Sequence, residues 1–138
     1  MTRLDICQQA LTWEGTKFRH QGRTKGVSTD CAGLIIGIAR ELGLDTFVEF
    51  KDYRDYQRIP NGDKMTAILN KFMDKVRNPE PGDVLHMRFF GNPQHLAILL
   101  EGNNIIHAAS NFGKVAVHRL DSEWKSYVVA AYRYRGVE

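Results

Sequence analysis

The most constraining feature of this sequence is a change in the spacing of its apolar residues near Pro81. Before Pro79, apolar residues recur every three or four positions, as they do on the buried face of an α-helix. After Pro81 they form short β-branched or aromatic runs, separated by turn residues such as Gly102-Asn103-Asn104. Helices that are followed by antiparallel strands indicate an α+β fold.

The spacing predicts three helices and about five strands. The helices are expected over residues 3–13 and 31–42, and from Asp63 along an apolar stripe that reaches Val76. The strands are expected over residues 83–88, 95–101, 104–108, 114–119 and 126–133. In the first helix, Leu4, Cys7, Ala10 and Leu11 are expected to face inward. We therefore predict N-terminal helices packed on a roughly five-stranded antiparallel sheet.

Length and charge limit the class of protein. The 138 residues suffice for one core and contain no linker or repeat, so we expect a single domain over residues 1–138. A net charge of +3 is too small to indicate nucleic-acid binding on its own, and it fits an acidic polymer such as a cell-wall glycopeptide equally well. The longest uncharged apolar run, residues 31–39, is far shorter than the roughly 20 residues that span a bilayer. Met1–Asp5 lacks a signal-peptide pattern, so we expect synthesis in the cytoplasm.

The segment from Ser28 to Leu34 places a cysteine at the start of the second expected helix. Asp30 is a good N-cap residue, and apolar residues then recur at helical spacing from Cys31 until Gly43 can end the helix. A thiol in a first turn lies among unpaired backbone N–H groups, which favour the thiolate and can also hold an oxyanion. Cys31 is therefore a candidate nucleophile, although most free cysteines are simply small buried hydrophobes.

A cysteine nucleophile needs a base, and the best candidates are His95 and His107. His95 begins an apolar strand, and His107 lies near the end of the following strand. An odd number of loop residues in the hairpin between them would place both imidazoles on one face of the sheet, whereas an even number would separate them. His20 and His118 are expected at the surface, and His86 is a fallback candidate for the base.

Two other interpretations of these residues remain open at this point. The histidines can be unrelated and half-buried, or Cys31, His95 and His107 can bind zinc, although their spacing is not clustered. With only Cys7 and Cys31, the chain cannot build a disulfide framework or a four-cysteine zinc site. We expect no metal and no other cofactor.

Five segments together resemble the NlpC/P60 family of cysteine peptidases, which have a circularly permuted papain-like fold. They are Trp13-Glu14-Gly15-Thr16, Asp30-Cys31-Ala32-Gly33-Leu34, Pro81-Gly82-Asp83-Val84-Leu85, Gln94-His95-Leu96-Ala97-Ile98 and Ile105-Ile106-His107-Ala108. No single segment is decisive, but their order makes a specific signal. The loop at 19–23 and the tail at 124–133 most resemble the small phage-tail subgroup of cell-wall peptidases.

The resemblance implies a role for each candidate residue. Cys31 is the nucleophile, His95 is the general base and later the acid, and His107 orients His95. The family often has tyrosine where Phe18 stands and serine where Ala32 stands; with the aspartate that corresponds to Asp30, these hold the amino end of the substrate. Of these three positions, only Asp30 has the polar side chain that the family has. Asp30 either contacts the substrate or merely caps the helix.

The resemblance also implies a substrate and a setting. The family hydrolyses amide bonds in peptidoglycan stem peptides, often between D-γ-glutamate and a diamino acid, without a metal. The phage-tail likeness implies other tail proteins as partners, and a virion tail that acts on the periplasmic cell wall. Two rival functions are an amidase or acyltransferase of the same superfamily with another substrate, and a non-catalytic module that binds the tail or the wall.

Overall fold

The computed structural model describes residues 1–44, 62–89 and 92–138, which form an α+β fold around one antiparallel sheet. The sheet has the order β3-β8-β4-β5-β6-β7. Its strands are β3 (Met73–Val76), β4 (Val84–Phe89), β5 (Asn92–Leu100), β6 (Asn104–Ala109), β7 (Lys114–Arg119) and β8 (Val128–Tyr134). The other elements are α1 (Arg3–Leu11), β1 (Arg23–Thr24), β2 (Ser28–Thr29), α2 (Cys31–Glu41), α4 (Gly62–Phe72) and α5 (Ser122–Ser126). The predicted α+β fold is confirmed, with six strands in the main sheet rather than about five.

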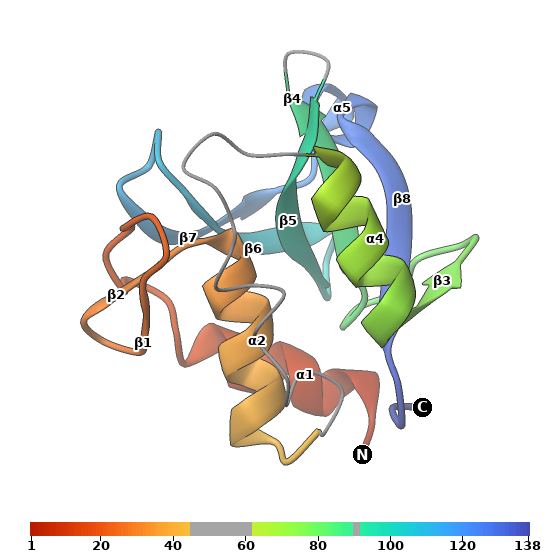
Figure 1. Ribbon diagram of the computed structural model, residues 1–138, viewed down its shortest axis with the longest axis horizontal. Coiled ribbons are helices and arrows are strands. Elements are labelled where there is room, and N and C mark those ends of the chain that lie inside the picture. The colour runs from red at the N-terminus through yellow and green to blue at the C-terminus, as the bar shows by residue number, and fades with distance from the viewer. Residues whose placement is uncertain (45–61, 90–91) are drawn as a thin grey trace.

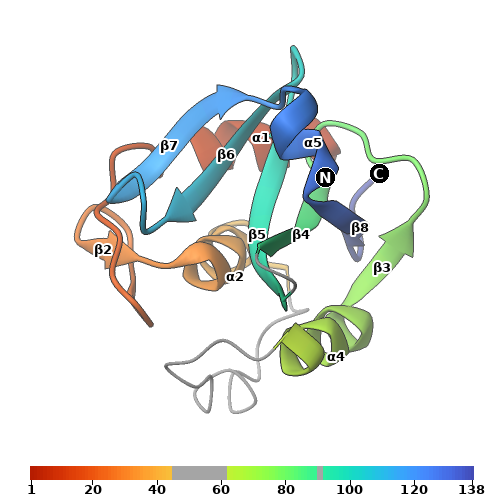
Figure 2. The same ribbon diagram turned by 90° about the horizontal axis from the view of Figure 1, so that it is seen from above.

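The sheet separates two apolar clusters. The larger cluster lies under α1, α2 and α4, and includes Ile6, Leu34 and Met65. The smaller cluster includes Leu99 and Ile105 and is covered on the opposite face by residues around α5. Figures 1 and 2 show α2 and α4 on one side of β4 and β5, with α5 on the other side. A residue on a central strand therefore faces either the long helices or α5.

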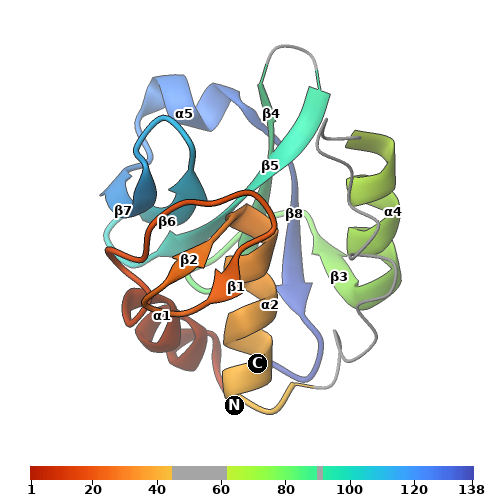
Figure 3. The same cartoon turned by 60° about the vertical axis from the view of Figure 1, so that its left-hand side comes forward.

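Helix α2 begins at Cys31 because Asp30 caps it. Asp30 has an extended backbone, and its Oδ1 accepts a hydrogen bond from the N–H of Gly33 at 2.7 Å. A Cβ on Gly33 would lie 2.3 Å from the carbonyl oxygen of Gly22, so only glycine lets the preceding loop pack on this turn. Figure 3 shows the β1–β2 hairpin in front of α2. This packing fixes the position of the first turn and of its cysteine.

The buried face of α1 differs from the prediction. Ile6, Cys7 and Ala10 are buried, but Leu4 and Leu11 are 47% and 46% exposed. The prediction that Leu4 and Leu11 face inward was wrong for these two residues. Both lie more than a third of a turn from Ile6 around the helix axis, and α1 uses the Ile6 side to approach the sheet.

The third helix also ends earlier than predicted. It stops at Phe72, and residues Met73–Val76 form strand β3, in which Met73 pairs with Tyr134 of β8. Apolar residues at both ends of a four-residue segment suit a helix or a strand, and pairing with β8 decides the outcome. The expectation that the aromatic residues of 46–61 (Phe47, Phe50, Tyr53 and Tyr56) cover the core or line a groove lies outside the described residues.

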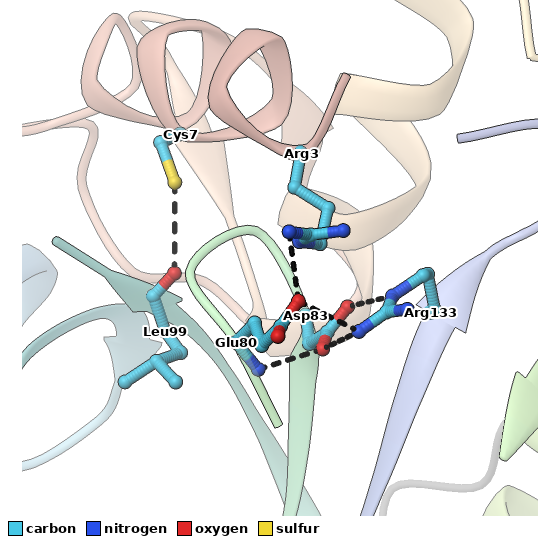
Figure 4. Close-up of polar contacts among 6 residues, drawn as sticks. All are labelled: Arg3, Cys7, Glu80, Asp83, Leu99 and Arg133. Carbon is cyan, nitrogen blue, oxygen red and sulfur yellow. Dashed lines mark hydrogen bonds and ion pairs between the residues drawn. The ribbon is translucent and has the colours of Figure 1, made fainter. Parts of the chain in front are cut away.

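A network of ion pairs ties the start of β4 to α1 and β8 (Figure 4). The guanidinium of Arg133 donates to both carboxylate oxygens of the fully buried Asp83, each at 2.7 Å. Glu80 lies 2.7 Å from Arg3 and 3.6 Å from Arg133. Gly82 has φ +97°, and a Cβ there would lie 2.4 Å from the carbonyl oxygen of Arg3. We call Arg3, Glu80, Asp83 and Arg133 the ion-pair network.

Candidate active site

Three histidines form a continuous chain across β5, β6 and β7. Nε2 of His95 lies 2.6 Å from Nδ1 of His107, and Nε2 of His107 lies 2.7 Å from Nε2 of His118. At the far end, Nδ1 of His118 lies 3.0 Å from the carbonyl oxygen of Arg119. We call His95, His107 and His118 the histidine relay.

The strand registers explain why these rings meet. Leu100 pairs with Asn104, which leaves three loop residues, the odd number that places His95 and His107 on one face. Ala116 of β7 pairs with His107, so His118, two residues further on, also lies on that face. His95 lies four residues before Leu99 in β5, so it is on the same face as Leu99, a member of the smaller cluster. The relay therefore lies on the α5 side of the sheet.

The sulfur of Cys31 lies beside β5, next to the residue that follows His95. The ladder between β5 and β6 ends at Ile98 and Ile106, although both strands continue. The N–H of Leu99 donates to the carbonyl oxygen of Asp83, at the start of β4. Successive N–H groups along a strand point to opposite sides, so the N–H of Leu96, three residues earlier, points toward β6. This N–H contacts the sulfur of Cys31, and their hydrogen bond lowers the pKa of the thiol. The sulfur thus lies where β5 and β6 separate, beside the residue that follows His95.

Burial controls the protonation of the site. Cys31 and His95 are each 7% exposed, and His107 is fully buried. Burial, with the neighbouring Asp30 carboxylate, raises the pKa of the Cys31 thiol to about 12, although N–H groups of Leu96, Ala32 and Cys31 oppose this. Burial likewise lowers the pKa of His95 to about 3 and that of His107 to about 2. At neutral pH the site holds the Cys31 thiol and the neutral imidazoles of His95 and His107.

The raised thiol pKa corrects one expectation. The sequence predicted that N–H groups at the helix start would favour the thiolate of Cys31. These groups do lower its pKa, but the loss of solvent outweighs them. A helix terminus stabilises a charge by a modest amount, whereas removing that charge from water costs more.

The three residues expected to contact substrate surround the start of α2. Both carboxylate oxygens of Asp30 accept backbone hydrogen bonds, from Gly33 at 2.7 Å and from Gln21 at 2.8 Å. Ala32 is buried in the larger cluster, and Phe18 packs against that cluster as a half-buried side chain. Asp30 therefore caps α2 and ties the loop at 19–22 to it.

His118 is the residue that the sequence prediction misplaced. It was expected at the surface among charges, but it is only partly exposed and contacts His107. The ring of Trp124 lies 4.6 Å from His118 and 5.1 Å from His107, and Phe112 lies 5.2 Å from His118. His118 lies two residues after Ala116 in β7, so the two share a face of the sheet, and this spacing is the sequence signal that could have placed His118 near His107. His86, the fallback base, is buried and lies 6.4 Å from the ring of Tyr132.

The geometry does not fit the zinc alternative. Both ring nitrogens of His107 lie within 2.7 Å of other imidazoles, so neither is directed at a position shared with Cys31. Within residues 1–44, 62–89 and 92–138, no group of three or more His, Cys, Asp or Glu side chains is arranged to hold a metal ion.

Comparison with known proteins identifies the family. A model of the NlpC/P60 family matches residues 15–133, which is most of the sequence. The chain belongs to the NlpC/P60 family. A search of curated protein sequences finds no match. In the part of the chain that the structure describes, no helix of this NlpC/P60 protein is long and apolar enough to cross a membrane.

Solved structures share the NlpC/P60 fold at low sequence identity. The NlpC/P60 domain of the peptidoglycan hydrolase SagA is 21% identical, with TM-score 0.67, over 96% of this chain and 98% of that one. An NlpC/P60 family protein from Bacillus cereus ATCC 10987 is 17% identical, with TM-score 0.71, over 97% of this chain and 40% of that one. A protein from Staphylococcus aureus subsp. aureus Mu50, similar to a lipoprotein of the NLP/P60 family, is 20% identical, with TM-score 0.66, over 99% and 41%. The chain thus spans about two fifths of the length of the last two proteins.

Proposed function

We propose that this protein is a cysteine peptidase that hydrolyses amide bonds in peptidoglycan stem peptides. The observation that carries the proposal is the histidine relay, which ends at His95, the residue before Leu96, whose N–H contacts the sulfur of Cys31. A buried thiol next to a neutral, hydrogen-bonded imidazole is the arrangement that thiol acylation needs. The name of SagA, a peptidoglycan hydrolase of the same fold, supports a wall substrate.

In the first half of the reaction, the thiol of Cys31 loses its proton as it attacks. Nε2 of His95 faces His107, so Nδ1 of His95 accepts the proton while the sulfur bonds to the amide carbon. The N–H groups of Cys31 and Ala32 lie beside the sulfur and can receive the oxyanion. His95 then protonates the leaving amine, the C–N bond breaks, and a thioester remains on Cys31.

In the second half, water replaces the amine. Nδ1 of His95 takes a proton from water as the oxygen attacks the thioester carbon, and the C–S bond breaks to release a carboxylic acid and restore the thiol. Because the resting pKa of His95 is low and that of Cys31 is high, proton transfer accompanies each attack. A preformed thiolate–imidazolium pair is not required.

The finer features of the proposal concern the bond and the setting. We propose a D-γ-glutamyl–diamino acid bond, with Asp30, Phe18 and Ala32 beside the amino end of the substrate. Phe18 and Ala32 offer no hydroxyl to an ammonium group, so cleavage should not require a free N-terminal L-Ala. We further propose that residues 1–138 act as one catalytic domain, made in the cytoplasm, in a phage tail that reaches the periplasmic wall.

The test is digestion of defined muropeptides, with product masses measured for the parental protein and for Cys31→Ala. We expect two fragments that together equal the substrate plus one water, and no fragments from Cys31→Ala. Cys7→Ala is the matched control, because Cys7 is also a buried thiol and lies on α1, 3.7 Å from the carbonyl oxygen of Leu99 (Figure 4). It should cleave at nearly the parental rate.

The same experiment separates the rival functions. Cleavage by Cys31→Ala at the parental rate would show that the mechanism is wrong. A product in which the acyl group is joined to an added amine would indicate an acyltransferase. Retention of muropeptide without any fragment would indicate a non-catalytic wall-binding module.

A further inference from the structure

We propose that His118 is a positioning residue that fixes, through His107, which ring nitrogen of His95 carries the proton. The inference rests on the proposed function, because it concerns the base that activates Cys31. Three contacts carry it: those between His95 and His107, between His107 and His118, and between His118 and the carbonyl of Arg119.

The carbonyl at the far end gives the relay its direction. A carbonyl oxygen only accepts hydrogen bonds, so Nδ1 of His118 carries a proton and donates to Arg119. In the proposed relay, Nε2 of His118 is an acceptor, and it receives the N–H from Nε2 of His107. Nδ1 of His107 is then an acceptor and receives the N–H from Nε2 of His95. Each ring thus sets the tautomer of the next.

The outcome of this chain is a lone pair at Nδ1 of His95. This is the nitrogen that does not face His107, and it must be unprotonated to remove a proton from Cys31. Without the acceptor on His118, His107 loses the partner for its Nε2 proton. It can then carry its proton on Nδ1 and donate to His95, which would leave Nδ1 of His95 protonated and unable to act as a base.

The surroundings of His118 hold its ring in the required orientation. Trp124, at 4.6 Å, and Phe112, at 5.2 Å, lie against the ring. The ring of Trp124 also lies 5.1 Å from His107, so one aromatic side chain packs against both members of the contact. This packing limits ring rotation and restricts the access of water to the bond between His107 and His118.

The direct test is NMR of the intact protein with ¹⁵N-labelled histidine, which reports the protonated nitrogen of each ring. At pH 7 we expect protons on Nε2 of His95, Nε2 of His107 and Nδ1 of His118. A proton on Nδ1 of His95 in the parental protein would overturn the proposal. Because this spectrum needs no turnover, the expected pattern in a protein that cleaves nothing would refute the proposed function and leave the relay standing.

A pair of variants tests the effect on catalysis. His118→Gln keeps an acceptor near the position of Nε2, whereas His118→Leu keeps similar bulk and has no acceptor. We expect kcat for muropeptide cleavage to fall about 10- to 100-fold in His118→Leu at unchanged KM, the range found when the hydrogen-bond partner of a metal-bound histidine is removed, and to stay within about 3-fold in His118→Gln. Equal losses in both variants, or parental kcat in His118→Leu, would overturn the proposal. The NMR spectrum of His118→Leu should show a second tautomer of His95, which a loss of packing alone would not produce.

Discussion

The histidine relay and the ion-pair network both bury polar groups against the same sheet, but they do so with different charges. In the ion-pair network, the fully buried Asp83 is neutralised by Arg133 through two hydrogen bonds of 2.7 Å. In the relay, the fully buried His107 has imidazoles on both sides, and burial lowers its pKa to about 2. The ion-pair network pairs opposite charges, whereas His95 and His107 of the relay are neutral at pH 7.

This difference separates a structural role from a chemical one. A guanidinium has no lone pair to accept a proton, so the pair of Asp83 and Arg133 has one arrangement of protons. A neutral imidazole both donates and accepts, so a chain of them can hold a lone pair at one chosen end. In the proposed function the relay supplies a base at His95, whereas the ion-pair network fixes α1, β4 and β8 in place. The predictions below test this division from the largest effect to the smallest.

The largest effect is expected from His95→Gln. The amide keeps a donor toward His107 but supplies no base, so kcat for muropeptide cleavage should fall about 10³- to 10⁴-fold. The free energy of unfolding, measured by urea denaturation, should change by less than about 1 kcal/mol. A kcat above a tenth of the parental value would show that the relay does not end in the catalytic base.

The opposite pattern is expected from Asp83→Asn. Loss of one partner of a buried ion pair leaves a charge uncompensated, and the cost for a fully buried pair is roughly 3–5 kcal/mol. Arg133 is a quarter exposed, so we expect a smaller loss, about 2–3 kcal/mol of unfolding free energy. The kcat of the folded protein should be unchanged. A selective loss of kcat without loss of stability would contradict the structural role.

Acid should destabilise the fold through His95 and His107 of the relay. In the folded protein the pKa values of His95 and His107 lie near 3 and 2, below the ordinary value of 6.5. Between about pH 6.5 and pH 3 the unfolded chain binds protons that the folded protein does not. The stability contributed by these histidines is therefore complete above about pH 6.5 and is lost as the pH falls below it. Two such groups give a slope of up to about 2.7 kcal/mol per pH unit in urea denaturation near pH 5.

His107→Gln is the matched variant for this slope. It removes one of the two groups, so the dependence of unfolding free energy on pH should become about half as steep. An unchanged slope would mean that other groups cause the acid sensitivity. On the alkaline side, the raised pKa of Cys31 predicts stability that is complete below about pH 8.5 and lost toward pH 12.

The smallest effect is expected from Asp74→Asn. Asp74 pairs with Arg135 at 3.2 Å, but both side chains are about half exposed or more, at 67% and 47%. Solvent and salt screen such a pair, so unfolding and cleavage should both stay within experimental error. A loss as large as that of Asp83→Asn would show that burial is not what distinguishes the ion-pair network.

Local signals predicted the parts of the site that depend on neighbours in the sequence. Asp30 and Gly43 marked the start and end of α2, which the structure confirms. The two-residue repeat of strands predicted that His95 and His107 share a face if the hairpin loop is odd, and Leu100 does pair with Asn104 to leave three loop residues. Such features follow from capping and from the two-residue repeat of strands.

Features that depend on packing could not be predicted in the same way. The charged neighbours of His118 suggested exposure, but the twist and register of β7 bring it to His107. The pKa of Cys31 depends on how much solvent the surrounding elements exclude, which the position of a helix start does not reveal. Met73 became part of a strand because β8 lies beside it.

The most direct test of the central claim is rapid acid quenching of a single turnover with a defined muropeptide, followed by mass spectrometry of the protein. The account predicts that the acyl part of the substrate appears transiently on the peptide that contains Cys31, and that Cys31→Ala forms neither adduct nor product. Release of both products with Cys31 unmodified at every time point, together with the parental rate in Cys31→Ala, would contradict it.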